Sequence, residues 1–169
     1  MMDITPLGDA YNALLDAAAS VADSKVSSPA PPGEWTADQI LAHVAIINAV
    51  TIAAVSAIAS GMNATYDNRI AQDAWTIDRI TALAGGNVGL RDRIRVQGEA
   101  LCALGGPMLS DAEHDTPIAT RLLSNGTLVL DQPVPLRDLI TGLAQAELPG
   151  HTEQLLALLS NGAGGEPTR

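Results

Sequence analysis

Apolar residues recur every three or four positions along most of the chain, a spacing that predicts helices. The first helix is expected over residues 5–23, where Thr5 would cap it and Pro6 suits the first turn. The apolar positions of this segment are Leu7, Tyr11, Leu14, Leu15, Ala18 and Val21. A loop rich in proline follows and breaks the regular structure.

The second predicted helix has the clearest start signal in the sequence. Thr36 and Gln39 are spaced as a capping box, in which each side chain satisfies a backbone donor of the other residue. The helix is expected to run to Gly61. Residues 40–59 contain no Asp, Glu, Lys or Arg, and a stretch of this length approaches that of a membrane span. We favour a helix buried in a bundle or at a subunit interface, because the segment is rich in alanine, carries polar residues and lacks flanking Lys or Arg.

The remaining pattern predicts three more helices and one hairpin. Helices are expected over residues 67–84 and 88–104, each followed by a double glycine. We favour a break at the first double glycine, and the alternative is one kinked helix. Residues 105–134 are polar and irregular, except that Asn125-Gly126 lies between two apolar runs and signals a type I′ turn. The last helix is expected over residues 135–159.

These elements predict an all-α protein, a bundle of four main helices with a short β-hairpin inserted before the last helix. The chain has 169 residues, which suits one domain, and we place that domain at residues 1–160. Residues 161–169 form an expected disordered tail.

Charge and composition narrow the classes of partner. There are 9 basic and 19 acidic residues, a net charge of −10, which disfavours binding to nucleic acid or to an anionic membrane. The acidic start of the chain does not resemble an export signal, so a cytoplasmic protein is expected. The single cysteine, Cys102, excludes an internal disulfide and is expected to be a buried structural residue.

Two of the three histidines lie in patterns that suggest chemistry. Glu147 and His151 are four residues apart in the last helix, so they face the same way, and Glu147 falls on the apolar stripe. A carboxylate there must be paired, neutralised or bound to a metal. If His43 of the second helix is a neighbour, the three residues offer the donor set of a catalytic divalent-metal site with an open position. Zinc fits these donors best, and nickel, iron or manganese fit them too. The alternatives are that His43 is a satisfied core histidine and that Glu147 pairs with Arg137, Arg121 or another arginine.

Other polar residues have simpler interpretations. His114 lies in an acidic loop, where a solvated histidine is expected. Arg91, Arg93 and Arg95 form a basic cluster, interpreted as a solvated face balanced by Asp92; the alternative is that they bind an anionic substrate or the carboxylate of a cosubstrate.

Two segments, EWTADQILAHVAIIN and PLRDLITGLAQAELPGHTEQLLAL, resemble the DinB-like superfamily, and within it the mycothiol-dependent maleylpyruvate isomerase-like branch. The resemblance implies a helical bundle whose metal is held by His43, Glu147 and His151, with glutamate as the middle ligand. Pro149 and Gly150 depart from this pattern, because they interrupt the helix between two ligands. The kink either tunes the ligand geometry or marks a site that has decayed.

The resemblance also implies a function. We expect a metal-dependent enzyme that resembles thiol-dependent S-transferases and isomerases, in which a metal-bound thiolate attacks a small electrophile and no protein nucleophile is needed. A low-molecular-weight thiol is the expected cosubstrate and a small molecule the substrate. The alternative is a non-catalytic, dimeric helical-bundle module for binding or stress, with a degenerate or structural metal site. In either case a homodimer is expected, with the uncharged second helix as a candidate contact surface.

Overall fold

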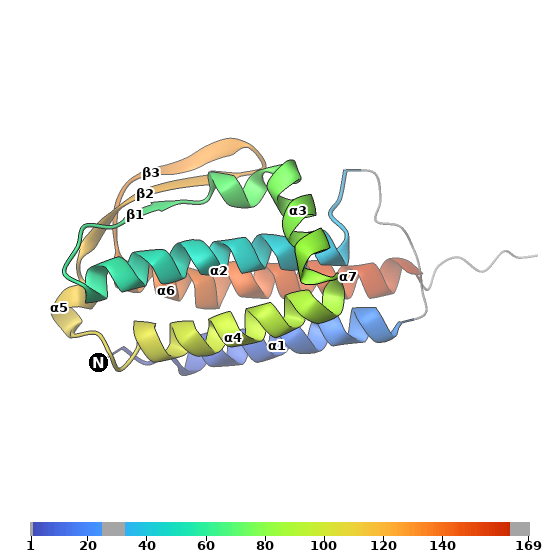
Figure 1. Cartoon of the computed structure of the whole chain (residues 1–169), viewed down its shortest axis with the longest axis horizontal. Helices are drawn as coiled ribbons and strands as arrows, with labels where there is room; N and C mark the ends of the chain where they lie inside the picture. The colour runs from blue at the N-terminus through green and yellow to red at the C-terminus, as the bar shows by residue number, and fades with distance from the viewer. Residues whose placement is uncertain (1, 25–32, 163–169) are drawn as a thin grey trace, which may run out of the picture.

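The computed structural model describes residues 2–24 and 33–162, and this part of the chain is mostly helical with a small three-stranded sheet (Figure 1). The last helix continues to Gly162, so the beginning of the expected tail is helical. The rest of that tail lies outside the described residues.

Four long helical segments run side by side (Figure 1). Their bounds are α1 (Thr5–Asp23), α2 (Ala37–Ala59), α4 (Asn87–Gly105) and a last segment made of α6 (Leu136–Gly142), the π-helical turn η2 (Leu143–Glu147) and α7 (Leu148–Gly162). Helix α1 packs against α4 and α7, and α2 packs against α4 and α7. The adjacency of α2 and the last segment positions the candidate site.

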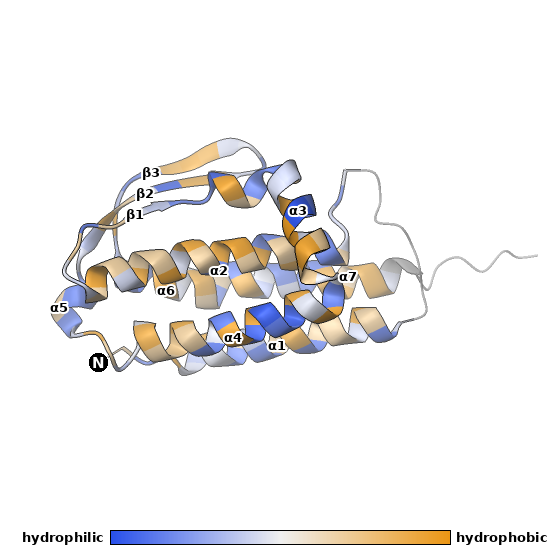
Figure 2. Cartoon of the chain, viewed as in Figure 1, coloured by the Kyte–Doolittle hydropathy of each residue, from blue (hydrophilic) through white to orange (hydrophobic). Residues whose placement is uncertain are grey.

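Helix α2 is the central core element. Its capping box is present: the Thr36 hydroxyl accepts from the Gln39 backbone amide at 3.2 Å, and the Gln39 side-chain oxygen Oε1 accepts from the Thr36 backbone amide at 3.0 Å. Figure 2 shows the apolar residues along this helix. By length and composition it is the one described helix able to cross a membrane, but 67% of its most apolar stretch is buried within the molecule. Its apolar character is therefore accounted for by packing inside the fold.

The sheet contains the expected hairpin and one unexpected strand. Strands β2 (Pro117–Ser124) and β3 (Thr127–Pro135) are antiparallel and are joined by Asn125 and Gly126, with φ of 49° and 75°, as a type I′ turn requires. Strand β1 (Thr65–Asp67) pairs in parallel with β2. The pattern predicted only helices outside the hairpin. Strand β1 shows that this prediction is wrong.

One predicted helix start and one predicted helix cap are wrong. The helix expected from residue 67 begins only at α3 (Ala74–Ala84), because Asp73 accepts from the Thr76 amide and caps it there. Residues before it form β1 and a short 3-10 turn, η1 (Arg69–Gln72). Helix α1 has the predicted bounds, but its N-cap is Ile4 and Thr5 is its first residue, so the hydroxyl of Thr5 does not cap it. The Thr5 amide instead donates to the Asp3 carboxylate at 2.9 Å.

The break at the first double glycine is confirmed. Gly85 and Gly86 have φ of 79° and 77°, and α4 starts at the next residue. Positive φ at two successive positions is accessible to glycine without a side-chain penalty.

A matched pair of glycines tests the packing of α1 on α4. A Cβ added at Gly98 would lie 2.9 Å from ring atoms of Tyr11, whereas a Cβ at Gly8 would meet nothing within 4 Å. Both changes to alanine gain the same helix propensity. We expect Gly98→Ala to be less stable than Gly8→Ala by about 1–3 kcal/mol in urea unfolding, the usual range for overpacking. Equal stability of the two variants would contradict the tight contact.

Candidate metal centre

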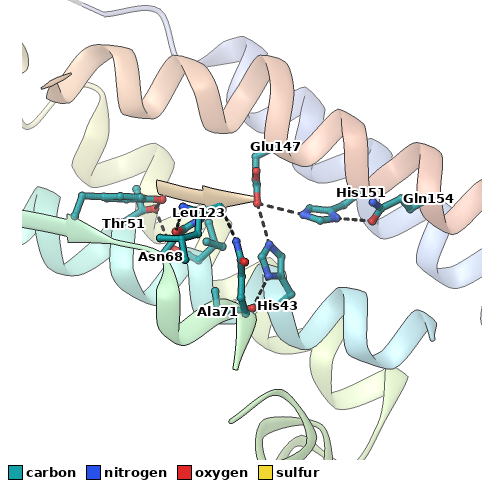
Figure 3. Close-up of polar contacts among 11 residues, drawn as sticks. His43, Thr51, Asn68, Ala71, Leu123, Glu147, His151 and Gln154 are labelled. Carbon is teal, nitrogen blue, oxygen red and sulfur yellow. Dashed lines mark hydrogen bonds and ion pairs between the residues drawn. The ribbon is translucent and has the colours of Figure 1, made fainter. Parts of the chain in front are cut away.

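His43, Glu147 and His151 come together in the structure, as the resemblance implied (Figure 3). One ligand atom from each residue lies within 4.8 Å of the other two. The Oε1 atom of Glu147 is 2.9 Å from Nε2 of His43 and 3.2 Å from Nε2 of His151. Two imidazoles therefore point at one carboxylate oxygen from two different helices.

The rings are held on their other sides as well. Nδ1 of His43 lies 2.6 Å from the backbone oxygen of Ala71, and Nδ1 of His151 lies 2.8 Å from Oε1 of Gln154 (Figure 3). The ring of His43 also packs against Trp35, with centroids 4.9 Å apart. A histidine that ligates a metal commonly donates its second N–H to such an acceptor.

These partners decide which nitrogen carries the proton. The Ala71 carbonyl can only accept, so Nδ1 of His43 donates to it, and Nδ1 of His151 likewise donates to Gln154. Each neutral ring then directs an Nε2 lone pair at Glu147, whose carboxylate offers lone pairs of its own. The two Nε2 atoms and the Glu147 carboxylate are then three acceptors that face one another, and they need a cation or added protons between them. This donor set fits a divalent metal.

The electrostatics of Glu147 follow from the same contacts. Hydrogen bonds from His151 and His43 hold the pKa of the Glu147 carboxyl well below its usual range, although burial opposes them. The arginine alternatives are wrong, because Arg137 pairs with Asp115 and Arg121 pairs with Asp131.

The π-helical turn sets the position of Glu147. Within it the Leu148 amide donates to the Leu143 oxygen, five residues earlier. The extra residue moves the buried stripe of the helix by one position, so that Leu148 is fully buried and the Glu147 side chain is 38% exposed. The expectation that Glu147 lies on the apolar stripe is thus corrected: it lies at the edge, and π-turns are frequent at functional sites.

Pro149 and Gly150 do not separate the ligands. Pro149 is the second residue of α7 and lies two positions after the end of the π-helical turn. A proline lacks the backbone N–H that a helix needs, and its ring crowds the carbonyl four residues earlier. For Pro149 that carbonyl lies within the π-helical turn, where the backbone is already distorted. Glu147 and His151 remain in contact across this distortion.

A cavity of about 1040 Å³ borders all three ligand residues. Its walls come from α2, from the hairpin and from the last helical segment. An open space beside the ligands is what a catalytic metal site needs, since one coordination position must stay free for substrate.

The remaining candidate residues stay outside this cavity. His114 is buried, not solvated: the capping box of Ser110 and Glu113 folds the segment into the short helix α5 (Asp111–His114), and Nε2 of His114 bonds to the Gly105 oxygen at 2.7 Å. Cys102 was expected to be buried and is instead half-buried; burial still raises the pKa of its thiol.

The basic cluster on α4 is a solvated face. Arg95 pairs with Asp92 and Glu99, and Arg91 bonds to Asn87. None of its arginines lines the cavity. The alternative role in binding a substrate at this site is therefore not supported.

Two groups that orient the ligands were not expected from the sequence. Gln154 follows His151 by three residues on the same helix face, so its spacing was a usable signal. The Ala71 carbonyl is a backbone group, and no side-chain pattern marks it.

Comparisons of the chain with protein-family models, curated proteins and solved structures gave no match.

The lowered pKa of Glu147 predicts an acid-dependent stability in the metal-free protein. The ionised carboxylate is favoured in the folded state, so its contribution is complete above the ordinary glutamate value of 4.5 and is lost as the pH falls toward the folded-state pKa. The difference in unfolding free energy between wild type and Glu147→Gln should shrink from about pH 6 to about pH 3. Glu153→Gln, at an exposed position of the same helix, is the control and should show no such trend. A constant difference for Glu147→Gln would contradict the assignment.

Proposed function

We propose that the protein is a metal-dependent enzyme that uses a low-molecular-weight thiol on a small electrophile, in the manner of S-transferases and isomerases. The observation that carries this proposal is the convergence of His43, Glu147 and His151 beside a large cavity. A divalent ion bound there would supply Lewis acidity and lower the pKa of a coordinated thiol or water. Zinc suits the two imidazoles and one carboxylate best, and nickel, iron or manganese are the other candidates.

The residues of the chain have distinct roles in this proposal. His43, Glu147 and His151 would hold the ion, and Ala71 and Gln154 fix the tautomer and the direction of the two rings. The cavity beside these ligands is lined in part by apolar side chains, among them Ile40, Leu139 and Leu143. The chain contributes no nucleophile, which agrees with a cysteine that lies outside the cavity.

We further propose that the four long helical segments form a four-helix bundle of DinB type, in the mycothiol-dependent maleylpyruvate isomerase-like branch. Support comes from one ligand on the second helix and two ligands, four residues apart, on the last. A cytoplasmic protein that binds neither nucleic acid nor membranes is proposed from charge and composition. The homodimer also remains a prediction; the packing of α2 against α3, α4 and α7 means that its apolar surface does not require one.

The cavity favours the enzyme over the non-catalytic module. A structural metal site is normally closed by four protein ligands. Here three candidate ligands border open space, so a position for a substrate or thiol is available.

An assay of thiol addition tests the proposed function. Zinc-loaded wild-type protein should accelerate the addition of a thiol to at least one member of a broad electrophile panel, and Glu147→Ala should not. Gln154→Ala should retain the reaction but lose about 10- to 100-fold in activity or metal affinity, as removal of an orienting partner usually does. Glu153→Ala is the matched control and should behave as wild type. No acceleration by metal-loaded wild type with any thiol tested would contradict the enzyme.

A further inference from the structure

We propose that the cavity beside the candidate metal centre binds an unbranched aliphatic chain, with the polar end of the ligand at the three metal-ligand residues and its tail beneath the hairpin. This inference deepens the proposed function and rests on it only where it identifies the chain as part of the electrophile. The fit of an extended chain follows from the length and the lining of the cavity.

The cavity is elongated and follows the last helical segment. Its lining recurs at every helical turn from Asp138 through Glu147 and His151 to Leu158. At a rise of about 1.5 Å per residue, the lining extends about 13 Å from Glu147 toward Asp138 and about 16 Å toward Leu158. The candidate metal centre thus lies near the middle of a space whose volume, about 1040 Å³, makes it much longer than it is wide.

The part of the cavity between Asp138 and Glu147, here named the hairpin arm, lies beneath β3. Strand β3 leads directly into α6, so the chain reverses there and the hairpin lies alongside α6 (Figure 1). Leu130 and Val134 of β3 both line the cavity, and four residues of a strand span about 13 Å. Strand and helix therefore border the hairpin arm over a similar length.

The lining of the hairpin arm is mostly aliphatic. Its apolar side chains include Ile47, Val129, Leu130, Val134, Leu139 and Leu143. The polar lining is already used in part: Asn68 donates to the Leu123 oxygen at 2.9 Å and accepts from the Leu123 amide at 2.8 Å, and the Tyr66 hydroxyl lies 3.3 Å from that of Thr51. An aliphatic tail would cover apolar surface here and leave these hydrogen bonds in place.

Small residues of the last segment keep the hairpin arm open. Gly142 and Ala146 both line it, and a Cβ added at Gly142 would meet nothing within 4 Å. An extended chain advances about 1.3 Å per bond, so about ten carbons fill the distance from Glu147 to Asp138.

A chain-length series measures the hairpin arm. Straight-chain alcohols from butanol to dodecanol are titrated calorimetrically into metal-free full-length protein, and straight-chain hydroxamic acids, whose headgroup chelates zinc, into the zinc-loaded protein. We expect affinity to rise about two- to fourfold for each added methylene, because each buries apolar surface. The rise should level off at about ten carbons, where the tail reaches Asp138.

A compact alcohol tests the shape of the ligand. Adamantanemethanol is a cage with nearly the carbon count of decanol, and it cannot extend along the hairpin arm. We expect it to bind metal-free protein at least about tenfold more weakly than decanol.

Two leucine variants locate the tail. Gly142 has helical φ and ψ of −60° and −40°, so Gly142→Leu introduces no backbone strain. Because Gly142 precedes Glu147 by five residues, this variant should move the plateau to about six carbons. Ala157→Leu is the matched control: it also adds a leucine to the lining, but on the other side of the metal-ligand residues, and should keep the plateau at about ten carbons. If Gly142→Leu does not fold, Ala146→Leu should remove the dependence on chain length.

The inference is overturned if affinity does not depend on chain length or rises without levelling off. It is also overturned if adamantanemethanol binds as tightly as decanol, or if Gly142→Leu and Ala157→Leu give the same plateau. The metal-free titration keeps this result separate from the proposed function. The expected plateau in a protein that transfers no thiol would support the ligand class and contradict the enzyme, whereas thiol transfer without any dependence on chain length would contradict the ligand class alone.

Discussion

Two imidazoles directed at one carboxylate oxygen form the contact on which the candidate site depends. Each ring is fixed by a second acceptor, so neither can turn its lone pair away from Glu147 without losing a hydrogen bond. The arrangement needs positive charge between the three groups, whether from protons or from a metal ion. Both histidines are buried, so the cluster is costly to leave uncompensated, and it depends on the packing of α2 against the last helical segment.

The packing of α2 is fixed by polar contacts as well as by its apolar faces. The Tyr11 hydroxyl donates to Asn48 at 2.6 Å, Asn48 lies 3.4 Å from Gln97, and Gln97 donates to the Ala45 oxygen at 3.0 Å. This network joins α1, α2 and α4, and hydrogen-bonded buried groups allow few alternative registers. Because His43 lies on the same helix, the network also fixes where its ring meets the last segment.

Much of the helical framework was predictable because its signals are local. The capping box of Thr36, the double glycine and the Asn-Gly turn each depend on residues close in sequence, and each is confirmed. Strand β1 was missed because its pairing with β2 joins residues more than fifty positions apart. The burial of His114 was missed for a related reason: composition marked a polar loop, whereas a local capping box folds it inward.

The three ligand residues were identified from spacing and resemblance, but their geometry was not. Regular helical periodicity places Glu147 on the buried stripe, and only the π-helical turn moves it to the edge of the cavity. A single proline, Pro149, indicated a distortion without indicating its form. The geometry of the site therefore depends on the π-helical turn, which the pattern of side chains in the sequence does not predict.

Metal content measured by elemental analysis on tag-free protein tests the central claim most directly. A tag would contribute its own histidines and must be removed. The account predicts about one divalent ion per wild-type chain and its loss in both Glu147→Ala and His151→Ala, because three ligands are the minimum for such a site. An absence of bound metal in wild type, even after reconstitution with zinc and with nickel, would contradict it.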